Sequence, residues 1–203
     1  MLRPNRRSIR LRGYDYSQPG AYFVTICTRG WVHLFGDVVD GEMRLNEFGE
    51  LVRAAWFDLP DHYNHVRLDA FVIMPNHVHS IIILTDDYPS VGAGVGAGFK
   101  PAPTMTTMKR HPLSEIVRAF KTFSARRINA LRGTPGAPVW QRNYYEHIIR
   151  NDRALDAIRR YIVHNPVRWH LDRYNAERVA PDPWAEEIWR MVREPPQQRE
   201  DKA

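Results

Sequence analysis

Cysteine and long apolar runs are what this sequence lacks. Its 203 residues contain a single cysteine, Cys27, which excludes an intrachain disulfide framework and leads us to expect a reducing, cytoplasmic setting. No run of about 18 apolar residues is present, so we expect no membrane partner. The N-terminus is basic but no apolar segment follows it, so it does not have the pattern of a secretion signal.

Basic residues outnumber acidic ones and are unevenly distributed. Lysine and arginine total 29 against 23 aspartates and glutamates, a formal net charge of +6 with a sequence pI near 9.7. Such a balance favours a polyanionic partner, most commonly nucleic acid. The cations gather in the first twelve residues, at Arg3, Arg6, Arg7, Arg10 and Arg12, and in a later stretch, at Arg118, Lys121, Arg126 and Arg127. Taken alone, either group is equally consistent with a solvated arm or helix face.

The residue pattern predicts an α+β architecture. Runs rich in β-branched and aromatic residues predict strands at 21–29, 66–74 and 77–84, with further extended structure at 31–45 and 139–150. Apolar residues at i, i+3 and i+4 predict helices that begin at Asn46, span 113–131, and run from Asn151-Asp152 to about Asn165. Short strands and the turn signal Asp40-Gly41 favour a mainly antiparallel sheet with helices against it.

Changes in composition divide the chain. The segment VGAGVGAGFKPAPT lacks apolar periodicity and is typical of a flexible linker or inserted loop. No Gly-Lys-Ser/Thr follows its glycines, so it is not a Walker phosphate loop. We expect a basic arm at 1–19, a domain at 20–175 with an insertion at about 86–111, and a C-terminal extension at 176–203 whose last residues are disordered.

Two histidines lie two residues apart on the strand expected at 77–84. Side chains two residues apart on a strand share a face, so His77 and His79 point one way and Val78 the other. Two such imidazoles can chelate one divalent ion. A lone His-x-His is more often a coincidence, but both rings adjoin a run of Ile and Leu, where an unpaired histidine is costly. The pair is therefore expected to have a partner, either a metal ion or a buried acid.

A tyrosine and an asparagine lie one turn apart on the last expected helix. Tyr161 and Asn165 are i and i+4, so they share a helix face. This face borders the apolar stripe of the helix, and we expect both side chains to point toward the sheet edge rather than solvent. Read separately, Tyr161 is a boundary aromatic and Asn165 is a C-cap before Pro166.

Together the two segments suit phosphodiester chemistry. A phenol, with a pKa of about 10, is a poor nucleophile at neutral pH. A divalent ion held by His77, His79 and the amide oxygen of Asn165 would polarise a phosphodiester and offset charge in its transition state. Tyr161 could then attack phosphorus, leaving a phosphotyrosine that conserves the bond energy for a second DNA end.

These segments resemble a known family pattern. His77-Val78-His79 matches the His-hydrophobe-His motif of HUH nucleases. Tyr161 with Asn165-Pro166, preceded by Trp140-Gln141-Arg142 and Glu146-His147, is similar to the transposases associated with bacterial repetitive extragenic palindromic (REP) sequences. Those are relatives of the single-tyrosine transposases of small insertion sequences. The resemblance spans the chain from about Gly20 to Trp169, and the motifs are far more specific together than singly.

The resemblance implies a ferredoxin-like fold, an antiparallel sheet with helices mainly on one face. It implies a metal-dependent endonuclease and strand-transferase that acts on single-stranded DNA beside a palindromic hairpin through a 5′-phosphotyrosine. By the family pattern, His77, His79 and Asn165 hold Mg²⁺ or Mn²⁺ and Tyr161 is the nucleophile. One branch of the family works as a dimer and the palindrome-associated branch can act as a monomer, so both states stay open here. The Gly/Ala/Pro insertion departs from the compact family pattern.

Other residues and other functions are weighed against this interpretation. Further DNA contacts are expected from Arg6, Arg7, Arg10, Arg12, Arg118, Lys121, Tyr144 and Tyr145. The main alternative is a non-catalytic sequence- or hairpin-specific DNA-binding protein derived from a transposase, which would bind without metal. A histidine-triad nucleotide hydrolase is disfavoured because position 81 is Ile rather than His. A replication-initiation or plasmid-relaxing HUH nuclease is disfavoured because those chains are usually larger.

Overall fold

Four antiparallel strands form the centre of the structure. The computed structural model describes residues 11, 13–86 and 110–193. In the order β4-β5-β1-β6, the sheet strands are β4 (Val66–Met74), β5 (His77–Leu84), β1 (Gly20–Cys27) and β6 (Tyr145–Ile149), and all neighbours are antiparallel. A separate hairpin is made of β2 (Gly36–Val39) and β3 (Glu42–Leu45). The α+β class with an antiparallel sheet is confirmed.

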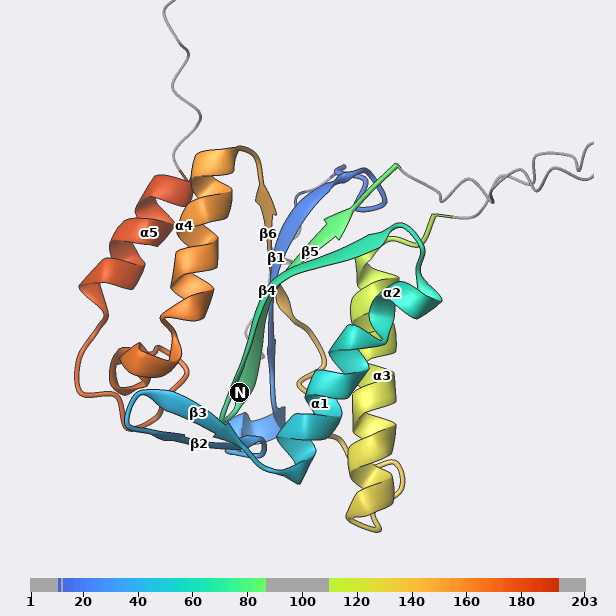
Figure 1. The fold of residues 1–203 in the computed structure, drawn as a ribbon, viewed down its shortest axis with the longest axis vertical. Coiled ribbons are helices and arrows are strands. Elements are labelled where there is room, and N and C mark those ends of the chain that lie inside the picture. Colours follow the sequence, from blue (N-terminus) through green and yellow to red (C-terminus); the bar gives the residue numbers. More distant parts are fainter. Residues whose placement is uncertain (1–10, 12, 87–109, 194–203) are drawn as a thin grey trace, which may run out of the picture.

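Helices flank the sheet (Figure 1). They are α1 (Glu47–Phe57), α2 (Leu59–His62), α3 (Leu113–Leu131), α4 (Asp152–Val163) and α5 (Pro183–Arg193), with 3-10 turns η1 (Arg29–Trp31) and η2 (Pro166–Leu171). Within the described part of the chain, no helix is both long and apolar enough to cross a membrane.

Local chemistry explains where these elements begin and turn. The Asn46 side chain accepts a hydrogen bond from the Gly49 N–H and caps α1, and the Asn151 side chain caps α4 in the same way. Between β2 and β3, Asp40 and Gly41 have φ values of 54° and 78°, the left-handed backbone that an Asp-Gly hairpin turn requires. The predicted helix starts and the predicted hairpin are therefore confirmed.

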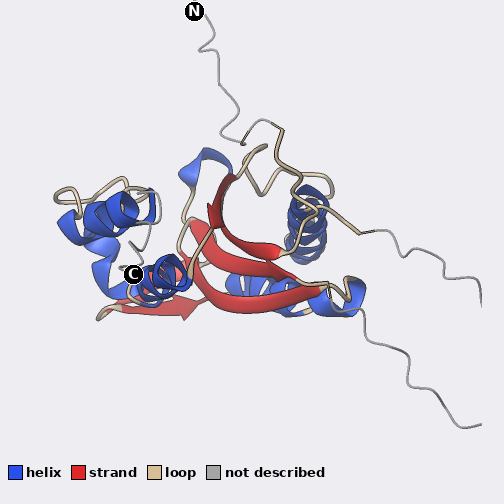
Figure 2. Ribbon diagram, turned by 90° about the horizontal axis from the view of Figure 1, so that it is seen from above, coloured by secondary structure: helices blue, strands red, loops and turns tan. Residues whose placement is uncertain are grey.

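The helices cover both faces of the sheet rather than mainly one, as Figure 2 shows from above. Because side chains alternate along a strand, Val24 of β1 and Val78 of β5 join the cluster under α1 and α3. Their neighbours Phe23 and Ile81 join a second cluster under α4 and α5. The sheet therefore separates two apolar layers, and each helix pair has its own.

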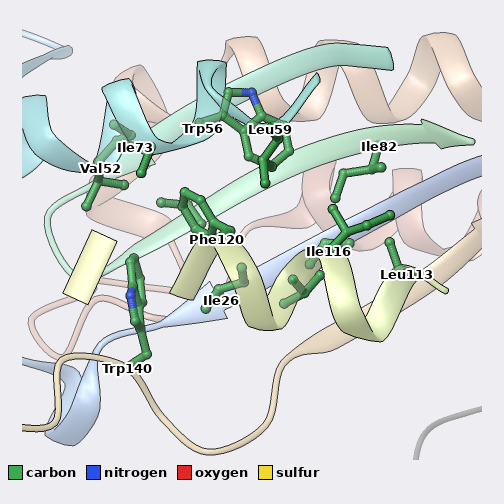
Figure 3. Packing of buried hydrophobic residues seen from close by; sticks show 14 of the residues in the cluster. Ile26, Val52, Trp56, Leu59, Ile73, Ile82, Leu113, Ile116, Phe120 and Trp140 are labelled. Carbon is green, nitrogen blue, oxygen red and sulfur yellow. The ribbon is translucent and has the colours of Figure 1, made fainter. Parts of the chain in front are cut away.

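Aromatic rings fill the layer under α1 and α3. Trp56 of α1 meets Phe120 of α3 edge to face at 5.7 Å between ring centroids, and Phe120 also contacts Trp140 at 5.7 Å (Figure 3). The indole N–H of Trp140 donates to the Ser124 hydroxyl (3.0 Å), so its polar atom is satisfied inside the core. Aromatic rings each bury a large apolar area, so this layer contributes heavily to stability.

The structure corrects several expected boundaries. The segment expected to be extended at 139–150 forms a strand only at β6, preceded by a single bridge from Trp140 to Thr28. Leu131, the last residue of α3, is 52% exposed. The C-terminal extension contains α5, which the sequence pattern did not predict. Most of the insertion expected at about 86–111 lies outside the described residues, as do the last ten residues.

Candidate metal and nucleophile site

The two histidines of β5 face the layer under α4 and α5. They have the same strand parity as Ile81, which belongs to that layer. In the register, His77 lies opposite Cys27 of β1 and His79 lies opposite Thr25. Both imidazoles are buried, with exposed fractions of 0% and 1%. The expected shared orientation is therefore what the sheet imposes.

The hydrogen bonds of the ring Nδ1 atoms leave both Nε2 atoms facing each other. The Asn76 amide nitrogen donates to the carbonyl oxygens of Trp31 (3.3 Å) and Tyr174 (2.8 Å), so its oxygen is turned toward His77. His77 Nδ1–H donates to this oxygen at 2.8 Å, and its Nε2 carries a lone pair. The Thr25 hydroxyl lies 2.8 Å from His79 Nδ1 and is able to accept its proton in the same way.

This arrangement fits a divalent cation. The two Nε2 atoms are 3.1 Å apart. Two ligands in adjacent positions around an octahedral ion, with bonds of about 2.1 Å, are separated by about 3.0 Å. Burial lowers the pKa of His77 to about 3 and that of His79 well below its usual value, so both rings are neutral and available as ligands.

Asp172 completes a cluster that the sequence analysis did not identify. One ligand atom from each of His77, His79 and Asp172 lies within 4.8 Å of the others, and all three residues are buried. One Asp172 carboxylate oxygen lies 4.0 Å from His77 Nε2, and the other accepts the Tyr174 N–H at 2.6 Å. Asp172 follows η2, beyond the helix-ending proline, where no periodic pattern links it to the histidines. Only the fold brings it to them.

Asn165 lies beside this cluster. Its side chain is buried, and its amide nitrogen donates at 3.0 Å to the same Asp172 carboxylate oxygen that lies 4.0 Å from His77 Nε2. Its amide oxygen is also buried and has no hydrogen-bond partner among the described residues. A buried acceptor without a partner is costly, and a cation is a partner that this oxygen can take. The donor set of two imidazoles, a carboxylate and an amide oxygen fits a divalent ion such as Mn²⁺.

Tyr161 of α4 reaches the same point from the opposite side. Its hydroxyl lies 3.3 Å from His79 Nε2. Two residues earlier, the Arg159 guanidinium donates two hydrogen bonds to the Asp69 carboxylate (2.9 and 2.7 Å), at a bulge in β4. This pair fixes α4 against the sheet. Burial raises the pKa of the Tyr161 phenol well above its usual value, and the Asp172 charge raises it further. The phenol is therefore protonated at neutral pH.

Helix α5 covers the phenol. Tyr161 is only 5% exposed, and its ring lies 5.6 Å from Trp189 and 6.4 Å from Trp184, both on α5. Trp189 also contacts Phe23 of β1 at 5.0 Å, so α5 is attached to the sheet as well as to α4. Both tryptophans lie in the region expected to be a simple extension, where their spacing of five residues gave no sign of this contact.

The residues expected to contact DNA are not gathered at this site. Arg118 and Lys121 belong to α3, on the other face of the sheet (Figure 1), and the Lys121 ammonium donates to the backbone carbonyls of Gln141 and Arg142. Tyr145 packs in the layer under α5, whereas Tyr144 packs in the layer under α3. The four arginines of the arm, Arg6, Arg7, Arg10 and Arg12, lie outside the described residues.

Known proteins share both the sequence and the fold. No family model matches the sequence. A Haemophilus influenzae protein named only "Uncharacterized protein" is 39% identical over 173 residues, which cover 83% of this chain and 92% of that protein. The solved "Structure of the REP associates tyrosine transposase bound to a REP hairpin" has a TM-score of 0.52 at 20% identity, covering 80% of this chain and 74% of the other. That likeness shows a shared fold.

A further relative carries the family name. A second Haemophilus influenzae protein, "Putative REP-associated tyrosine transposase", is 25% identical over 154 residues, 76% of this chain and 74% of that protein. The chain is therefore similar to REP-associated tyrosine transposases in sequence and in fold. In this chain, the two segments that carry the sequence resemblance, the His-x-His strand and the Tyr-Asn helix, meet at the 3.3 Å contact between His79 and Tyr161. The similarity to the second relative supports a transposase-family function.

Proposed function

We propose that this chain is a metal-dependent single-strand DNA endonuclease and strand-transferase that acts beside hairpin-forming DNA through a 5′-phosphotyrosine. The observation that carries the proposal is the meeting of three groups. Two neutral imidazole nitrogens lie 3.1 Å apart, and the Tyr161 hydroxyl lies 3.3 Å from one of them. A metal-capable cluster beside a buried phenol supplies both parts of phosphoryl transfer to tyrosine.

The cluster supplies the metal ligands in this proposal. His77, His79 and Asp172 would hold Mg²⁺ or Mn²⁺, with the orphan amide oxygen of Asn165 as a fourth donor. When bound, the ion polarises the phosphodiester and offsets charge that develops on its oxygens. Asn76 keeps His77 in the ligating tautomer, which is how partners of a metal-bound histidine generally act.

Tyr161 forms the covalent bond. Its Oη attacks phosphorus, the bond from phosphorus to the 3′ oxygen breaks, and the DNA remains attached to the enzyme through its 5′ phosphate. The phenol proton is lost as the bond forms, and the departing 3′ oxygen takes up a proton to become a hydroxyl. A free 3′ hydroxyl of a second DNA end can later reverse these steps, which transfers the strand without an external energy source.

Hairpin DNA is the substrate that the relatives favour. The solved REP-associated tyrosine transposase is bound to a REP hairpin, and its fold is shared over 80% of this chain. The net charge of +6 agrees with a polyanionic partner. The layout of a basic arm at 1–19, a domain at 20–175 and an extension at 176–203 is part of this proposal, and so is action as either a monomer or a homodimer.

A covalent-adduct assay tests the proposal. Labelled single-stranded oligonucleotides that contain a hairpin from repeats near the gene are incubated with Mg²⁺ or Mn²⁺ and resolved on a denaturing gel. We expect a protein-DNA adduct with the wild type and none with Tyr161→Phe or His77→Ala, whereas the distant controls Tyr63→Phe and His62→Ala retain it. Hairpin binding without an adduct under any metal would instead support a DNA-binding protein that does not cleave.

A further inference from the structure

A cavity lies beside Tyr161. Its volume is about 770 Å³, and its wall includes Tyr161, Asn165 and Asp172 on one side and Trp189 of α5 on the other. The remaining wall comes from η2, from α5 and from the segment between them. The cavity is the space from which a substrate can approach the phenol, because the ring itself is almost completely covered.

The cavity is rich in uncompensated positive charge. Arg168 on its wall is neutralised, since its guanidinium donates two hydrogen bonds to the Asp182 carboxylate. Four further arginines line the wall and have no ion pair among the described residues: Arg173, Arg178, Arg190 and Arg193. Of the acids on the wall, Asp172 belongs to the metal-capable cluster, and Glu186 is left to face the free arginines. The net field therefore attracts anions.

Arg173 brings this charge to the reacting groups. Its guanidinium lies over the Tyr174 ring, 5.3 Å from the centroid, and Tyr174 in turn contacts the His77 ring at 4.7 Å. The charge of Arg173 lowers the pKa of both Tyr161 and His79, opposing the effect of Asp172 on each. An anion bound at Arg173 would thus lie next to the nucleophile.

A second hollow extends the charged surface away from the site. It has a volume of about 330 Å³ between α4 and α5, and it shares Trp184 and Arg190 with the first cavity. Arg153 and Arg160 of α4 line it opposite Glu187 of α5, and neither arginine has an ion pair among the described residues. The cations therefore continue from one hollow into the next, which suits a chain of phosphates better than a single anion.

We propose that these two hollows bind the single-stranded DNA flank next to the scissile phosphate. Arg173 and Arg178 hold the phosphates nearest Tyr161, Arg190 holds the next, and Arg153 and Arg160 guide the strand along α4. This assignment rests on the proposed nuclease function, because that function identifies the polyanion as single-stranded DNA. It names the part of the substrate that the hairpin itself does not provide.

Binding of matched oligonucleotides tests the assignment. A hairpin with a single-stranded flank and the same hairpin without it are titrated against wild type, Arg178→Ala/Arg190→Ala, and the control Arg53→Ala on α1, on the opposite face of the sheet. We expect the double variant to bind the flanked hairpin more weakly, by on the order of tenfold for each arginine. The slope of log affinity against log salt should fall by about 0.7 per lost phosphate contact. Affinity for the bare hairpin should stay unchanged.

Several outcomes would overturn the assignment. An equal loss of affinity for the flanked and bare hairpins would mean that the arginines contact the hairpin. No loss of affinity for either would mean that they do not contact DNA. All of these arginines are exposed, so we expect the variants to have the same thermal unfolding midpoint as the wild type. This measurement serves as the folding control. Failure of the nuclease function is seen separately: wild type would form no adduct while flank binding still depended on Arg178 and Arg190.

Discussion

Removing the Asn76 side chain should weaken metal binding without touching a ligand. Asn76 is 1% exposed, and its amide makes three hydrogen bonds, to His77 Nδ1 and to the carbonyls of Trp31 and Tyr174. In Asn76→Ala the His77 ring loses the acceptor that fixes its tautomer, and loss of such a partner typically weakens metal affinity by about 10–100-fold. Three hydrogen bonds at about 1 kcal/mol each predict a loss of about 3 kcal/mol in unfolding free energy.

Thermal and chemical unfolding with and without Mn²⁺ separates the two effects. A ligand at 100 times its Kd stabilises the folded state by about 2.7 kcal/mol. At the same Mn²⁺ concentration, a tenfold weaker site gains about 1.4 kcal/mol and a hundredfold weaker site gains about 0.4 kcal/mol. We therefore expect Asn76→Ala to be less stable without metal and also to gain less from it.

Asn76→Asp is the matched variant. Its carboxylate still accepts from His77 Nδ1 but cannot donate to the two carbonyls, so stability should fall by about 2 kcal/mol while the gain from Mn²⁺ stays near the wild-type value. An Asn76→Ala protein with the full wild-type gain from Mn²⁺ would refute the reasoning, because the tautomer would then not depend on Asn76.

Three further results are expected. Asp172→Ala should lose most of the stabilisation by Mn²⁺ measured in the same unfolding assay, and full retention would remove it from the ligand set. Asp69→Asn should destabilise by about 1 kcal/mol at pH 7. Hydrogen bonds from Arg159 lower the folded-state pKa of Asp69, so the wild-type advantage is present above about pH 4 and must shrink as the pH falls further in pH-dependent denaturation. Gly49→Ala should cost about 2 kcal/mol or more despite the better helix propensity of alanine, because its Cβ would lie 2.4 Å from the Phe35 carbonyl oxygen. In the same urea titrations Gly133→Ala, at a φ of 67° with open space around it, shows the cost of backbone strain without a steric clash.

The local parts of this structure were predictable from local sequence. The bounds of β4, β5 and α3 follow from runs of β-branched residues or from helical periodicity, and the starts of α1 and α4 follow from Asn46 and Asn151 as caps. The common face of the two histidines follows from strand alternation alone. Each of these features depends on residues that are close together in the chain.

The missing parts depend on contacts between distant segments. Asp172 lies near His77 only because η2 turns the chain back toward β5. The spacing of these two residues in the sequence does not predict this contact. The same holds for Trp189, whose ring covers Tyr161 from a helix that the sequence pattern did not predict. That helices pack on both faces of the sheet could not be predicted from the amphipathic pattern of single helices. Such a pattern indicates which side of a helix is buried but not which face of the sheet it packs against.

Because the site lies between the sheet and the second apolar layer, its two halves differ in their stability against local unfolding. The histidines belong to β5, which is hydrogen-bonded to a strand on each side, whereas Tyr161 belongs to a helix held by the smaller layer and by the ion pair with Asp69. Amide protons of such doubly bonded central strands generally exchange with solvent last, and those of peripheral helices exchange earlier. Local opening of the α4 and α5 layer should therefore move the nucleophile while the histidine pair keeps its geometry. Hydrogen-deuterium exchange would register this as protection of β5 that outlasts protection of α4 and α5.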